Sequence, residues 1–141
     1  RREGATDRAS FQNFSFNFDS AAGIIYTVDV TKPKGEKITI ISMADGTPFS
    51  MDKMYKVALN SYRGNGGGEL LTKGAGIPQD ELKGRILFST DKDLRYYLMQ
   101  YIEKKGVIEP HALGQWKFIP EEWVEPAAKR DYEYLFGKVE K

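Results

Sequence analysis

The residues of this chain that could bind a ligand lie in a glycine-rich segment, Arg63-Gly64-Asn65-Gly66-Gly67-Gly68. It follows residues 54–60, where Tyr55, Val57 and Leu59 alternate with their neighbours in the period-2 pattern of a strand. Glycine has no Cβ, so it adopts positive φ readily and lets backbone N–H groups approach a ligand closely. The segment is therefore a candidate ligand loop, although a tight turn after a strand would have the same composition.

The segment carries neither of the common nucleotide-binding fingerprints. The phosphate loop G-x-x-x-x-G-K-[ST] needs a Gly-Lys step followed by Ser or Thr, and the Gly137-Lys138 step lacks both the upstream glycine and that hydroxyl residue. The dinucleotide pattern G-x-G-x-x-G fails because Glu69 and Leu71 occupy its last position in the two possible registers. Fingerprints alone therefore leave the segment a candidate.

No catalytic constellation can be assembled from the other residues. The sequence has no cysteine, and its one histidine, His111, follows Pro110 in a predicted loop. Nucleophilic catalysis needs a nucleophile beside a base, and a metal site needs clustered ligands, whereas the carboxylates here are scattered. A glycosidase-type carboxylate pair stays open, but nothing points to one. The pattern favours a recognition module over a catalyst.

Composition narrows the partners of the chain. Its 141 residues include 21 basic and 20 acidic ones in a mixed distribution, which argues against nucleic acid as a partner. No apolar run approaches the roughly 18 residues of a membrane span. The polar start, RREGATDRAS, is not a signal peptide, so we expect the chain to begin after any targeting segment or inside a larger protein. We expect residues 1–10 to be a linker and residues 11–141 to form a single domain.

Alternating phenylalanines follow the expected linker. Phe14, Phe16 and Phe18 would share one face of a strand over residues 11–19, and a core role is the simplest interpretation for most of them. The alternative is that one ring, near the turn at 19–23, leaves the core and stacks on a flat ligand.

The remaining pattern indicates an α+β fold. The expected elements are strands at 23–30, 36–43, 55–60 and 115–119, a first helical turn at 78–82, and helices at 90–105 and 126–136. The first three strands, joined by short turns, suggest antiparallel pairing. The helix at 90–105 is predicted to begin at a Thr90 cap and to end at Gly106. Its apolar residues at helical spacing predict one core stripe, Leu94, Tyr97, Leu98, Tyr101 and Ile102.

Several segments together resemble a known family. GIIYTVDVTKPKGEKI and ADGTPFSMDKMYKVALNSYRGNGGGELL, in order within residues 14–71, are similar to the C-terminal domain of bacterial metallophosphatases. These enzymes are 5'-nucleotidases, UDP-sugar hydrolases and cyclic-nucleotide phosphodiesterase/3'-nucleotidases. The resemblance implies an α+β domain with a mixed or antiparallel sheet packed with helices. Family domains begin earlier than this chain, so it is expected to be most of such a domain, truncated at its N-terminus, with apolar faces that are incompletely covered.

The resemblance also implies a division of labour. In the family, an N-terminal domain holds two divalent metal ions and an Asp–His pair that cleave the phosphate ester, while the C-terminal domain binds the base and sugar. The expected partners are thus a nucleoside or nucleotide and the N-terminal metallophosphatase domain of the same polypeptide, with no cofactor in this chain. The implied location is the periplasm, the cell surface or the medium.

The resemblance assigns site residues as well. Family members hold the base between two aromatic rings; the first ring corresponds to Phe18, and Leu70 stands where the second is usual. Leucine can cover one face of a base but has no π-face. The expected binding residues, predicted to face one another across a shallow cleft, are Phe18, Asn60, Arg63, Asn65, Gly66, Gly67, Gly68 and Leu70. The alternative function is a non-catalytic binding or scaffold module that kept the fold and lost the nucleotide pocket, which Leu70 favours.

Overall fold

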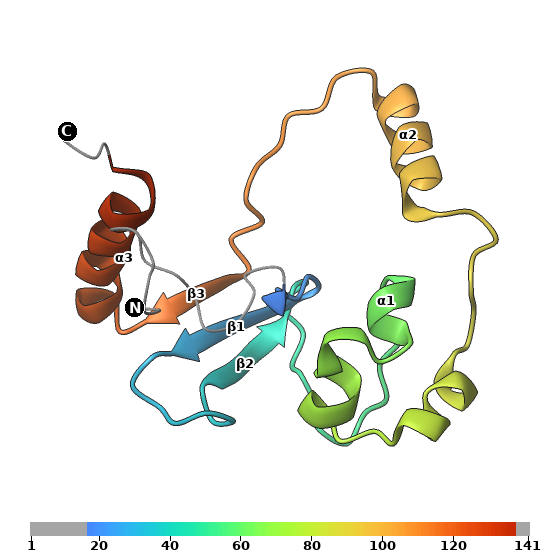
Figure 1. The fold of residues 1–141 in the computed structure, drawn as a ribbon, viewed down its shortest axis with the longest axis horizontal. Helices are drawn as coiled ribbons and strands as arrows, with labels where there is room; N and C mark the ends of the chain where they lie inside the picture. Colours follow the sequence, from blue (N-terminus) through green and yellow to red (C-terminus); the bar gives the residue numbers. More distant parts are fainter. Residues whose placement is uncertain (1–16, 138–141) are drawn as a thin grey trace, which may run out of the picture. The chain divides into compact units, whose positions relative to one another are not determined.

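The structure is a computed structural model that describes residues 17–137, drawn as a ribbon in Figure 1. The chain divides into two compact units. Among the described residues, the first comprises residues 17–52 and 112–137, and the second comprises residues 53–111. The second unit is therefore inserted, in sequence, between two parts of the first.

The first unit contains a three-stranded mixed sheet. Strands β1 (Ile24–Asp29) and β2 (Ile38–Met43) form an antiparallel hairpin, and β3 (Trp116–Ile119) pairs parallel with β1, giving the order β2-β1-β3 (Figure 1). The strands predicted at 23–30, 36–43 and 115–119 are confirmed, as is the α+β class with a mixed sheet.

An aspartate and a threonine two residues later stabilise the turn after β1 and the turn after β2. After β1, Oδ1 of Asp29 accepts hydrogen bonds from the Thr31 amide (2.9 Å) and hydroxyl (2.6 Å). After β2, Oδ1 of Asp45 accepts the same two bonds from Thr47, at 2.9 and 2.7 Å. Such side-chain turns reproduce the geometry of a backbone turn. The first of them lies in the D-x-x-K-P-x-G segment of the family resemblance, so Asp29 of that segment has a structural role.

Tyr26 is the buried centre of the first unit. Its side chain is 6% exposed, and its ring stacks on Trp116 across the β1–β3 pair, with centroids 6.0 Å apart and planes 12° apart. The Tyr26 hydroxyl accepts a hydrogen bond from the Ala21 amide (3.1 Å), which ties the segment before β1 to the sheet.

Helix α3 (Glu121–Phe136) follows β3 and contacts it. It begins earlier than the predicted 126–136, because Glu121 and Glu122 lie in the first turn, where carboxylates are favoured by the positive end of the helix dipole. Lys117 Nζ lies 2.5 Å from Glu121 Oε1, and this hydrogen bond lowers the pKa of Glu121. Gly137 ends the helix, as predicted.

The second unit consists of short helical segments and one longer helix. The segments are α1 (Ser61–Gly64), the 3₁₀ turn η2 (Gly67–Glu69), the π turn η3 (Leu70–Gly74), and the 3₁₀ turns η4 (Gln79–Glu81) and η5 (Lys83–Arg85). The strand predicted at 55–60 is wrong, since the sheet of the described residues contains only β1, β2 and β3. Alternation alone cannot make a strand without a neighbour to pair with, and Asn60 instead caps α1.

Helix α2 (Leu94–Lys105) begins four residues after the predicted start. Asp93 Oδ1 accepts the Tyr96 amide at 3.0 Å and is the N-cap, whereas the Thr90 hydroxyl donates to the Lys92 carbonyl. The end at Gly106 is confirmed.

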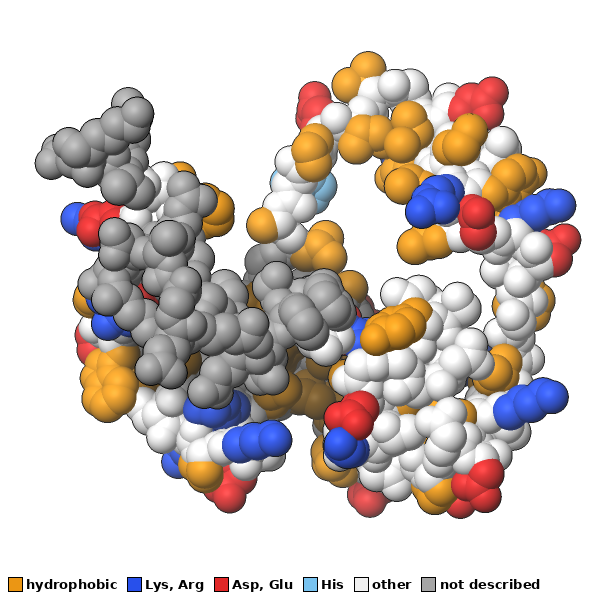
Figure 2. Space-filling view, viewed as in Figure 1, with side chains coloured by type: hydrophobic (Ala, Val, Ile, Leu, Met, Phe, Trp, Pro, Cys, Tyr) orange, Lys and Arg blue, Asp and Glu red, His pale blue; other side chains and the backbone are white. Residues whose placement is uncertain are grey.

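The prediction that the apolar stripe of α2 is core is wrong in this structure. Its side chains are 40% (Tyr97) to 72% (Leu94) exposed, and hydrophobic atoms lie on the surface over α2 in Figure 2. Helical spacing determines which residues share a face, but the element that covers this face must come from elsewhere. Among the described residues, only Tyr26, Arg63 and Leu82 are buried.

Replacing Thr31 with Ala should raise the pKa of Asp29 toward its ordinary value, because the Thr31 hydroxyl is the largest cause of its lowered pKa. A carboxyl whose pKa is lower in the folded state contributes stability above its unfolded pKa, near pH 4, and loses it as the pH falls through the folded pKa. A carboxyl-detected NMR titration measures the shift. Thr47→Ala removes the equivalent hydroxyl at the other turn and should leave the pKa of Asp29 unchanged; an equal effect of both variants would contradict the assignment.

Candidate functional site

The glycine-rich segment begins as a capped helical turn. The Asn60 side chain accepts the Arg63 amide at 2.8 Å, which satisfies a free N–H group at the start of α1. The Asn65 side-chain amide donates to the Ser61 carbonyl at 2.8 Å, at the other end of the same turn. Both asparagines of the predicted site therefore hold the local backbone in place.

Arg63 lies inside this turn. It is 5% exposed, its Nη1 donates to the Gly67 carbonyl at 3.1 Å, and its guanidinium carbon lies 5.3 Å from the centre of the Tyr62 ring. A buried guanidinium requires hydrogen-bond partners, and the carbonyl of Gly67 supplies one. Arg63 joins α1 to the glycines that follow it.

The glycines are required by backbone conformation and by close packing. Gly66 and Gly68 have φ of 91° and 68°, which side chains with a Cβ rarely adopt. A Cβ on Gly66 would lie 2.5 Å from Gln79 Oε1, and one on Gly67 would lie 2.5 Å from the Tyr62 carbonyl oxygen. The segment is thus a compact turn packed on neighbouring side chains, so its glycine content is explained without a ligand.

Part of the segment does face solvent. Asn60, Asn65, Gly68 and Leu70 are exposed, Leu70 by 36%. Glu69 has a positive φ of 61° and forms an ion pair with Lys73 at 2.6 Å. Of the predicted binding residues in this unit, these four are accessible to a ligand, whereas Arg63 is buried and Gly66 and Gly67 are half-buried.

Phe18, the remaining predicted site residue, belongs to the first unit. Its ring is 62% exposed, with its centroid 5.9 Å from that of Trp116 and the planes tilted by 46°. Phe18 lies in no strand, and it lies outside the core. Phe14, Phe16 and most of the strand predicted at 11–19 lie outside the described residues.

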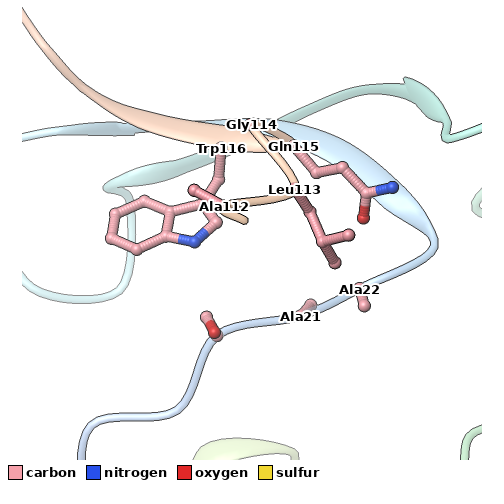
Figure 3. A pocket seen from close by; sticks show the side chains of 8 residues that line it. Ala21, Ala22, Ala112, Leu113, Gly114, Gln115 and Trp116 are labelled. Atoms are coloured by element: carbon pink, nitrogen blue, oxygen red, sulfur yellow. The ribbon is translucent and has the colours of Figure 1, made fainter. Parts of the chain in front are cut away.

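The first unit contains a hollow beside Trp116, the residue whose ring lies next to Phe18. The sequence did not indicate this hollow. Its volume is about 380 Å³, and it is bordered by residues 20–22 before β1 and by residues 112–116 at the start of β3 (Figure 3). Its two walls are about 90 residues apart in the sequence and come together only because β3 pairs with β1. The one sequence feature that could have pointed to the hollow is Trp116, which the sequence placed only within the strand predicted at 115–119.

Neither a metal cluster nor a membrane helix is found in the described part of the chain. Across residues 17–137, no three His, Asp or Glu side chains are placed to share a metal ion. No helix there has both the length and the apolar character that a bilayer crossing requires.

Comparison with known proteins assigns the family. The profile of the 5'-nucleotidase C-terminal domain matches residues 3–73, half of the chain. The chain belongs to this family. The match covers the β1–β2 hairpin, the turn that follows β2 and the whole glycine segment, which are the stretches that carried the resemblance.

Two curated relatives agree with the family. The chain is 31% identical over 121 residues to the trifunctional nucleotide phosphoesterase protein YfkN of Bacillus subtilis. It is 26% identical over 121 residues to a 2',3'-cyclic-nucleotide 2'-phosphodiesterase/3'-nucleotidase of Haemophilus influenzae. The alignments cover 77% and 75% of this chain but only 8% and 17% of the relatives. No solved structure matches the chain.

Gly66→Ala should destabilise the second unit by at least about 1–2 kcal/mol, because the new Cβ meets both an unfavourable positive φ and the Gln79 side chain. Amide hydrogen exchange over residues 61–74 measures the loss. Gly64→Ala is the matched control: Gly64 has no positive φ, and an added methyl group would have no neighbour within 4 Å, so protection should stay equal or rise slightly. Equal exchange in both variants would contradict the packing role of Gly66.

Proposed function

We propose that this chain recognises the nucleoside part of the substrate of a metal-dependent phosphohydrolase. The bond-breaking chemistry would take place at divalent metal ions on an N-terminal metallophosphatase domain of the same polypeptide. Membership of the 5'-nucleotidase C-terminal family and the nucleotide-phosphoesterase names of both relatives support this proposal. The contribution of the chain would be positioning, which lowers the entropic cost of bringing an ester to its catalyst.

The observation that carries the proposal is the accessible ring of Phe18 beside Trp116. Many apolar side chains of the described residues are exposed, but the 62% accessible ring of Phe18 lies with its centroid 5.9 Å from that of Trp116, which supports it from one side. A base stacked on an aromatic ring gains about 1–3 kcal/mol in nucleic-acid-binding proteins. One ring alone therefore provides weak binding, with a dissociation constant on the order of several millimolar or more.

The glycine segment would contribute in two ways under this proposal. Asn65 and Leu70 are exposed, so an amide and an apolar side chain are accessible to sugar or base. Asn60, Arg63, Gly66 and Gly67 would act by holding the turn that presents them, since their contacts lie within the unit. Leu70 would cover a base without stacking on it.

The proposed setting of the parent protein follows from the family. We propose an exported protein, located in the periplasm, at the cell surface or in the medium, whose role is nucleotide breakdown. Activity, metal content and location are properties of a whole polypeptide. Both curated relatives are several times longer than the part of them that matches this chain.

A second candidate function rests on Leu70, which replaces the usual second ring. A scaffold module that has lost its base pocket would have the same fold without nucleoside affinity. Assays of the full-length polypeptide with nucleotide esters, with and without Mn²⁺ or Zn²⁺, separate the two functions. Metal-dependent release of phosphate favours substrate recognition, and its absence together with absence of nucleoside binding favours the scaffold.

Titrating the chain with adenosine 5'-monophosphate should shift the NMR signals of Phe18 and of the exposed residues of the glycine segment. Phe18→Leu retains an apolar side chain but removes the π-face, so affinity should fall about fivefold, corresponding to the lower end of a stacking contribution. Phe88→Leu, at another exposed phenylalanine (82%), is the matched control and should bind as the wild type does. Shifts confined to surfaces remote from Phe18 and from residues 63–70 would exclude both groups of residues from nucleoside binding.

A further inference from the structure

We propose that the hollow beside Trp116 holds the heterocyclic base, and that Trp116 and Gln115 contact it. This inference rests on the proposed nucleoside recognition and adds residues that neither the sequence nor the family resemblance indicated. It concerns the first unit alone.

The size and walls of the hollow suit a flat ring. Its volume of about 380 Å³ lies in the range of small-molecule pockets, about 300–1,000 Å³. Small residues, including Ala21, Ala22 and Gly114, border it, so side chains do not fill the space. In Figure 3 the Leu113 side chain extends toward the segment that carries Ala21 and Ala22, and the Trp116 indole lies to one side of it.

The polar groups of the hollow are suited to base edges. Gln115 Oε1 accepts the Gly23 amide at 3.0 Å, which fixes the carboxamide, while its Nε2 donates no hydrogen bond to any described residue. The Trp116 indole N–H likewise has no hydrogen-bond acceptor within residues 17–137. Half-buried donors of this kind find partners when a ligand or water enters. Ring nitrogens and carbonyl oxygens of bases are such acceptors.

The absence of charge around the hollow indicates which part of a nucleotide it accepts. Residues 20–22 and 112–116, its borders, include no Lys, Arg, Asp or Glu. A phosphate group requires cations or several amide donors in place of its hydration shell, whereas a neutral heterocycle requires an apolar surface and a few polar groups. The hollow therefore fits the base and excludes the phosphate.

The position of Phe18 makes the hollow continuous with an aromatic surface. Phe18 and Tyr26 lie 5.9 and 6.0 Å from Trp116 between ring centres, so the indole has ring neighbours that limit its movement. A base in the hollow would meet an indole already oriented by the fold, which reduces the ordering cost of binding.

The test uses the full 141-residue chain with Trp123→Phe, which leaves Trp116 as its only tryptophan. Adenosine and uridine should quench Trp116 fluorescence and shift its indole N–H signal, and ribose 5-phosphate, which has no base, should do neither. Ala22→Leu fills the hollow and should weaken nucleoside binding at least fivefold. Ala44→Leu, at an exposed turn alanine after β2, is the control for added bulk and should bind normally.

Two results would overturn the inference. The first would leave the proposed function intact, and the second would overturn the proposed function as well. If nucleosides shift Phe18 or Leu70 but leave the Trp116 signals unchanged, and Ala22→Leu binds as well as Ala44→Leu, nucleoside recognition stands and the hollow is not its site. If no signal of the chain responds to nucleosides at millimolar concentration, the proposed function fails and the assignment of the hollow fails with it. Signals of β1 and β2 in each variant establish that the hairpin remains folded.

Discussion

The parallel pairing of β1 with β3, with Tyr26 stacked on Trp116, is the interaction on which the first unit depends. It joins positions 90 residues apart and returns the chain to the hairpin after the 53–111 unit. Tyr26 also binds the Ala21 amide, so one buried ring positions both the strand and the segment that precedes it. Phe18 and the walls of the hollow are placed by these contacts, and they need no further element to bring them together.

The family segments of this chain are explained by structure before they are explained by ligands. Asp29 closes a turn, Asn60 caps a helix, Arg63 binds a carbonyl inside the glycine segment, and Gly66 packs where a side chain cannot fit. Each of these positions admits few residue types for reasons of geometry alone. Sequence similarity to the family at such positions is strong evidence for the fold. Any inference about the substrate must instead come from the side chains that the fold leaves exposed.

The sequence predicted those parts of the fold that depend on local interactions. The β1–β2 hairpin, β3 and the ends of α2 and α3 at glycines follow from alternation, turn chemistry and capping within a few residues. The strand at 55–60 and the core stripe of α2 depended on partners that alternation and helical spacing cannot supply. The hollow was beyond prediction for the same reason, because residues 20–22 and 112–116 become neighbours only through the parallel pair. Within the predicted site, Phe18 was assigned by the family resemblance, whereas burial of Arg63 could not be foreseen from a charge in a glycine-rich segment.

The proposed site also determines what selectivity this chain can supply. As a base site, a hollow bordered by neutral residues would distinguish ring systems by shape and by hydrogen bonds to the Gln115 and Trp116 donors, and would have little means of distinguishing one phosphate ester from another. Recognition of the ester, including whether the phosphate is at the 5' or 3' position or is cyclic, would then belong to the metal-bearing domain. Binding energy gained at the base would assist hydrolysis only as far as it fixes the ester at the metals in the transition state. A weak, well-oriented base site is therefore consistent with a domain whose task is positioning.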